Sequence, residues 1–178
     1  MTPDPYKIHQ RGQSLVEFAL SSVVLLLLVG GLVDIGRGIY LSEILSNAAR
    51  EGARHGAWYD APHQRTPYLD DADIQAAVDQ ELAAASLPAS ILRVGCPGVA
   101  DGNGYHNPPY PNAVYPGTSG QPWLYICYSN TSGPPAQGGG QDLNVIVLYS
   151  YAPLTPLISG QFGTFRLAAN QHITVQGP

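Results

Sequence analysis

Charged residues are scarce in this sequence of 178 residues, where they make up 12% against 44% hydrophobic residues. This is a low share for a soluble domain. Positive charge is scarcer than negative charge, and the net charge of −5 argues against nucleic acid as a partner. After Gly56 three arginines face eight acidic residues, so the entire net charge lies in the C-terminal part. The length accommodates one ordinary domain in addition to any membrane segment.

Motifs for catalysis or ligand binding are also lacking. No serine stands in a nucleophile-elbow context, and no Gly-rich loop falls between a strand and a helix. The stretch from Asp101 to Asn112 begins like a calcium loop, but its glycine is at the fourth place instead of the sixth. The histidines show no ligand spacing; they are His9, His55, His63, His106 and His172. We therefore expect no catalytic residue, no metal and no cofactor, and we see no internal repeat.

One long apolar run stands out, from Phe18 to Val33. Extended to Tyr40 it comprises 23 residues, about 34 Å as a helix, which is enough to cross a hydrocarbon core of about 30 Å. We expect a transmembrane segment at about 18–40. Asp34 and Arg37 fall at its far end, three residues apart on one helical face, where they can pair with each other or reach the interface.

Basic residues precede this run. Lys7 and Arg11 form a short positive flank, which places the N-terminus in the cytoplasm and the C-terminal domain outside. A cleaved secretory signal would also begin this way, but its apolar stretch is shorter and ends at a small-residue cleavage site. An uncleaved anchor fits everything except Glu17, a carboxylate at the very start of the apolar run.

A third interpretation accounts for Glu17. A basic leader ends in Gly12, Glu17 follows five residues later, and the aromatic Phe18 opens the apolar helix. This arrangement resembles prepilin-type substrates, which a membrane peptidase cuts after the glycine. More narrowly, "GQSLVEFAL", "DIGR" and "LSNAAREGAR" resemble the TadE-like family of minor pilins (pseudopilins) of the tight-adherence pilus system. The resemblance covers residues 11–56, and Ser21-Ser22 stands where such sequences often carry a proline.

The resemblance implies cleavage between Gly12 and Gln13. Cleavage would leave an ammonium group on Gln13 near the membrane edge, where the Glu17 carboxylate of a neighbouring subunit or of the same chain can neutralise it. Glu17, with Phe18 beside it, would then set the register in which apolar helices assemble. The alternative is that Glu17 is a tolerated interfacial charge.

The helical pattern continues beyond the membrane to about Trp58, with Pro62 after it. One face carries small residues that permit close approach of another backbone; they are Ala48, Ala49, Gly52, Ala53 and Gly56. This face can pack against other subunits or under the chain's own sheet. Arg50 and Arg54 are expected to pair with Asn47 or Glu51, one turn away.

The remaining chain, residues 59–178, predicts an α+β head. A helix is expected within 69–87, capped by Asp70 or Asp71 and ended by Pro88. Period-two patterns then predict strands of an antiparallel sheet, separated by Gly/Pro-rich loops; these strands are expected at 90–96, 123–129, 143–151 and 165–175. The loop 97–122 is rich in proline and tyrosine, and its tyrosines can pack on the head or form an adhesive surface; they are Tyr105, Tyr110 and Tyr115.

The only two cysteines, Cys96 and Cys127, each lie in a predicted strand, with one of the long loops between them. Outside the cytoplasm such a pair predicts a disulfide, worth about 3–4 kcal/mol for a loop of this length. Two buried free thiols are the alternative.

Together these features predict a structural protein rather than an enzyme. We expect a leader (1–12), a long helix (13–58) and an extracytoplasmic head, in the cytoplasmic membrane, with the pilus at the cell surface as a further destination. The expected partners are membrane lipid, other pilin or pseudopilin subunits, a prepilin-type peptidase and the pilus assembly platform. An uncleaved component of the export machinery is the alternative, and an anchored ligand-binding module would need an ordered pocket in the head.

Overall fold

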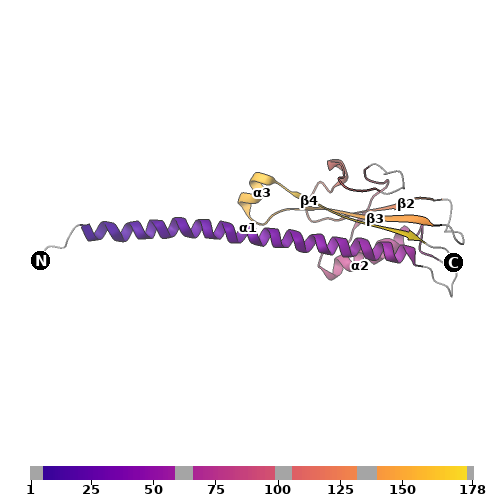
Figure 1. Cartoon of the computed structure of the whole chain (residues 1–178), viewed down its shortest axis with the longest axis horizontal. Helices are drawn as coiled ribbons and strands as arrows, with labels where there is room; N and C mark the ends of the chain where they lie inside the picture. The colour runs from indigo at the N-terminus through magenta and orange to yellow at the C-terminus, as the bar shows by residue number, and fades with distance from the viewer. Residues whose placement is uncertain (1–5, 59–65, 99–105, 132–139, 176–178) are drawn as a thin grey trace.

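The computed structural model describes residues 6–58, 66–98, 106–131 and 140–175. It consists of one long helix, α1 (Tyr6–Ala57), with a smaller α+β head folded on the C-terminal half of that helix (Figure 1). At 52 residues α1 is about 78 Å long. Its N-terminal half projects away from the head. The predicted α+β class and the long N-terminal helix are confirmed.

The sheet of the head has four strands in the order β1-β2-β3-β4. Strands β2 (Trp123–Tyr128), β3 (Gln141–Tyr151) and β4 (Phe165–Val175) are antiparallel neighbours, as predicted. The short edge strand β1 (Ile91–Leu92) departs from the prediction, because it runs parallel to β2. The sheet is therefore mixed.

Both larger helices cover the same face of the sheet. Helix α2 (Asp71–Ala84) begins at its N-cap Asp70, whose side chain accepts a hydrogen bond from Asp73 N, and it buries Ile74, Val78 and Leu82. These residues meet α1 and alternate residues of β3 in a single core. The other face of β3 is covered by the loop before β2, which contains the 3-10 turn η1 (Asn112–Val114) and the buried Tyr110.

A third helix lies between β3 and β4. Helix α3 (Pro156–Phe162) packs beside α1 at the end of the head nearest the projecting half of α1 (Figure 1). Its seven residues are too few for a periodic signal, and the sequence patterns did not predict it. It places the turn between β3 and β4 against the middle of α1.

Candidate functional site

The N-terminal half of α1 is an unpaired apolar surface. From Gly12 to Val33 hardly any residue is covered by the rest of the chain, and leucines such as Leu26 and Leu28 are 70% and 67% exposed. In the described part of the chain, the helix from Gly12 to Ala57 is the one that is long and apolar enough to cross a membrane. A surface of this kind requires lipid or other apolar helices around it.

The predicted processing and register residues lie at the start of this surface. Gly12 and Gln13 are exposed within α1, and a Cβ on Gly12 would meet nothing within 4 Å. Glu17 is exposed beside Phe18, which is 73% exposed. Among the described residues no hydrogen bond or ion pair reaches Glu17. The geometry therefore leaves its carboxylate open to a partner from outside this chain.

Asp34 is the buried acidic residue of α1, with only 4% of its surface exposed. Its carboxylate accepts hydrogen bonds from Leu154 N at 2.7 Å and from Thr155 N at 2.9 Å. The Tyr151 hydroxyl donates to the same carboxylate at 3.2 Å and to the Asp34 carbonyl at 3.1 Å. Asp34 thus fastens the end of β3 and the start of α3 to the middle of α1. Hydrogen bonds to an ionised group are stronger than neutral ones.

The sequence left open whether Asp34 pairs with Arg37 or reaches the interface, and in the structure its carboxylate bonds to the head. Arg37 instead stacks over the Tyr151 ring, 5.4 Å from its centroid. The sequence spacing suggested a local pair because both residues lie on one helical face, and the real partners are 117 to 121 residues away along the chain. An acidic residue inside an apolar run was the available signal, but it identified no partner.

The small-residue face of α1 is buried inside this chain. Ala48 and Ala53 are fully buried and Ala49 is 1% exposed. A Cβ on Gly52 would lie 2.4 Å from Val78, and one on Gly56 would lie 2.4 Å from Leu143. The sequence left open whether this face packs against other subunits or inside its own chain. The structure shows it packed inside the chain, so the face has no surface left for a second subunit.

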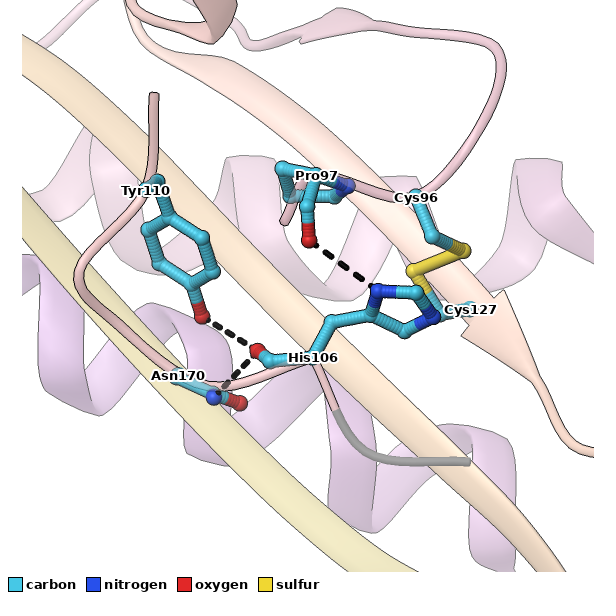
Figure 2. Close-up of a disulfide and its surroundings, with 6 residues drawn as sticks. All are labelled: Cys96, Pro97, His106, Tyr110, Cys127 and Asn170. Atoms are coloured by element: carbon cyan, nitrogen blue, oxygen red, sulfur yellow. Dashed lines mark hydrogen bonds between the residues drawn. A yellow bond between two sulfur atoms is a disulfide. The ribbon is translucent and has the colours of Figure 1, made fainter. Parts of the chain in front are cut away.

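A disulfide joins Cys96 and Cys127, with 5.7 Å between their Cα atoms (Figure 2). His106 lies beside it and contacts the Pro97 carbonyl oxygen through Nδ1 at 3.0 Å. The His106 carbonyl in turn accepts hydrogen bonds from the Tyr110 hydroxyl at 2.6 Å and from Asn170 Nδ2 at 2.8 Å. The disulfide and this network tie the loop before β2 to the sheet.

Cys96, His106 and Cys127 offer ligand atoms within 4.8 Å of one another. Metal ions bind cysteine as the thiolate, and the two sulfur atoms are bonded to each other here. In this state the cluster is a crosslink rather than a metal-binding site. The sequence identifies the two cysteines but gives no signal for His106, because no ligand spacing relates it to them.

The tyrosines of the same loop differ in their surroundings. Tyr110 is only 6% exposed, and burial raises its pKa well above the usual range. Tyr115 is half-buried, with Arg166 stacked over its ring at 5.6 Å. Tyr105, like Asp101 and Asn103 of the calcium-like stretch, lies outside the described residues. The tyrosines that the structure describes therefore pack on the head and offer little adhesive surface.

Comparison with known proteins gives a family match within helix α1. The family model described as "TadE-like protein" matches residues 12–54, about a quarter of the chain. Searches of curated proteins and of solved structures returned no match. The match begins at Gly12, includes the exposed apolar surface and Asp34, and ends in the small-residue face. Residues 12–54 of this chain are thus similar to the TadE-like family.

Proposed function

We propose that this protein is a structural subunit of a tight-adherence pilus, a minor pilin or pseudopilin. The observation that carries the proposal is the division of α1, whose TadE-like segment is folded under the head at one end and left fully exposed and apolar at the other. A soluble protein would bury the exposed half, whereas a subunit that moves from membrane to fibre needs it bare for lipid first and for neighbouring helices later.

In this proposal the peptidase cuts between Gly12 and Gln13. The new ammonium group of Gln13 and the carboxylate of Glu17 then lie within about 6–7 Å of each other along one helix, or meet between neighbouring subunits. Both charges are costly in apolar surroundings, and each compensates the other. Lateral contacts would use the exposed N-terminal half of α1, because the small-residue face is occupied by the head.

The test is mass spectrometry of N-terminal peptides from native membranes and from sheared surface fibres. The wild-type protein is expected to begin at Gln13 and to occur in fibres, and Gly12→Leu is expected to keep its leader and stay out of them. Gly36→Leu is the matched control, because Gly36 is also exposed on α1 with nothing within 4 Å of a Cβ, and its processing should be normal. An intact N-terminus in wild type would contradict processing and favour the uncleaved export component.

A further inference from the structure

The end of the head nearest the exposed half of α1 is apolar and uncharged. Residues 152–165, here called the head tip, contain no charged residue. In the head tip Leu154 is 63% exposed, Phe162 71% and Phe165 43%. The head as a whole carries an excess of acidic residues, so this end differs chemically from the rest. Clustered exposed large apolar side chains mark a contact surface.

The length of the membrane span places the head tip within the bilayer. The uninterrupted apolar run, residues 18–33, has 16 residues and is about 24 Å long as a helix, short of the roughly 30 Å hydrocarbon core. A span of about 20 residues that starts after Glu17 therefore continues to about residue 37. The head tip packs against α1 at Gly30 and Gly31, which come before residue 37 and therefore lie within this span.

Two close contacts show where along α1 the head tip packs. Thr155 Oγ1 lies 3.0 Å from the position of a Cβ on Gly30, and Ile158 Cδ1 lies 3.7 Å from one on Gly31. The head tip is thus level with a point about 10 Å inside the outer end of the span. This is the depth at which interfacial apolar segments lie in a leaflet.

The head tip is attached firmly at this depth. The bonds from Leu154 N and Thr155 N to Asp34 hold it against α1, and they compensate an acidic charge that would be costly within the span. The same bonds satisfy two backbone N–H groups that apolar surroundings could not satisfy. Asp34 is therefore compatible with a membrane environment only because the head tip donates hydrogen bonds to its carboxylate.

A groove of about 650 Å³ lies between α1 and the head tip. It extends along α1 from Gly31 to Ser42, about 16 Å, with nearly apolar walls that include Ile35, Ile158 and Phe162. Four polar residues also line it, namely Asp34, Ser42, Tyr151 and Arg166. Asp34 and Tyr151 are hydrogen-bonded within the chain, and Arg166 Nη1 donates to Asn112 Oδ1 while its guanidinium stacks over the Tyr115 ring. The groove is therefore an apolar channel beside the span, and lipid acyl chains are the apolar groups that surround a span at this depth.

We infer that the head tip lies in the outer leaflet of the membrane and that a lipid acyl chain occupies the groove between it and α1. The inference rests on the membrane-anchored arrangement of the proposed function and adds a second lipid contact to it. This contact sets the height and tilt of the head above the membrane before any assembly. It is a lipid-binding site to which the head contributes one wall and α1 the other, in addition to the bare surface of the span.

The test is photolabelling of the full-length protein in vesicles of phosphatidylethanolamine and phosphatidylglycerol that carry a diazirine on one acyl chain. Lipid adducts are expected on the apolar half of α1 and also on residues 158–165. Adducts confined to α1 would overturn the inference and leave the anchor intact, whereas no adducts on either segment would overturn both. Crosslinks between two protein chains at the head tip, in place of lipid adducts, would show that a second copy fills the groove and would overturn the lipid assignment.

A depth measurement with matched variants provides an independent readout. Phe162→Trp and Val94→Trp both alter exposed apolar residues of the head, and each is made in a background of Trp58→Phe and Trp123→Phe. In vesicles, the Phe162→Trp protein is expected to show blue-shifted emission, quenched by acyl-brominated lipid and protected from acrylamide. The Val94→Trp protein should show the reverse. Equal acrylamide quenching of both proteins would overturn the inference.

Discussion

Leu26 and Leu45 are leucines of the same helix, yet Leu26 is 70% exposed and Leu45 is fully buried. The difference divides α1 into an outer half, which this chain leaves bare, and an inner half, which it covers with β3, β4 and α2. The residue types change accordingly. The outer half has large apolar residues all round, and the inner half has alanines and glycines on the face under the head. One continuous helix is thus adapted to two different environments.

The largest expected contrast comes from truncating one leucine in each half. Leu45→Ala leaves a cavity in the core of the head and should lower the free energy of unfolding by about 2–5 kcal/mol. Leu26→Ala removes contacts only with the solvent, detergent or lipid around α1. It should change the free energy of unfolding by less than about 0.5 kcal/mol. Denaturant unfolding in mild detergent, followed by near-UV circular dichroism, measures both. Equal losses would contradict the division of α1.

Asp34 lies where the two halves meet, and its replacement should have the next largest effect. Asp34→Ala leaves the N–H groups of Leu154 and Thr155 without their acceptor and should cost about 1.5–3 kcal/mol, as for bonds to a charged group. Hydrogen exchange at these two amides should accelerate well beyond that of β3. Glu43→Ala, an exposed acidic residue of the same helix, is the control and should leave both amides protected. Unchanged protection in Asp34→Ala would show that the head tip is held by packing alone.

Two glycines of α1 distinguish its bare surface from the surface that the head covers, by the space available for a side chain. Gly52→Leu places a side chain where a Cβ alone would come within 2.4 Å of Val78, and such overpacking typically costs about 1–3 kcal/mol. Gly36→Leu, with nothing within 4 Å of a Cβ, should leave the unfolding of the head unchanged. Thermal unfolding of the two variants side by side measures the difference. A stable Gly52→Leu protein would mean that α1 and α2 can move apart easily.

Much of this division could be predicted from the sequence, because it depends on residue types repeated at fixed spacing. The apolar run, the small-residue face and the alternation in β3 and β4 each extend over many residues. Strands β2, β3 and β4 and helix α2 were predicted close to their observed positions, whereas only Ile91–Leu92 of the strand expected at 90–96 form β1. The pairing of Cys96 with Cys127 followed from their number and from the compartment implied by the membrane segment.

What the sequence did not predict depends on contacts between distant residues. The partners of Asp34 come from the turn between β3 and β4, and no local pattern connects them to α1. The parallel edge strand β1 spans two residues, too few for any periodicity. Helix α3 is equally short, and its position against Gly30 and Gly31 follows from the fold of the whole head. The groove and the head tip are therefore visible only in three dimensions.

The smallest expected effect lies on the outward-facing side of the inner half. Arg54 Nε donates to Glu51 Oε2 at 2.9 Å, one of the pairs that the helical spacing predicted, and Arg50 Nη1 donates to Asn47 Oδ1 at 3.3 Å. The hydrogen bond and charge of Arg54 lower the pKa of Glu51 below its usual value of 4.5. A carboxyl with a lowered pKa in the folded state stabilises the protein above its unfolded pKa, and the contribution is lost as the pH falls through the folded value.

Because the pair is partly exposed, its contribution is limited to about 0.2–0.5 kcal/mol. Glu51→Gln should therefore be slightly less stable than wild type at neutral pH. The difference should shrink as the pH falls below the usual range of a glutamate carboxyl, and also as salt is added at neutral pH. Denaturant unfolding of both proteins across pH measures it, with Glu43→Gln as the exposed control on the same helix. A difference that persists at low pH and high salt would assign the effect of Glu51 to packing of its side chain, and the outward side of the inner half would then be part of the interface with the head.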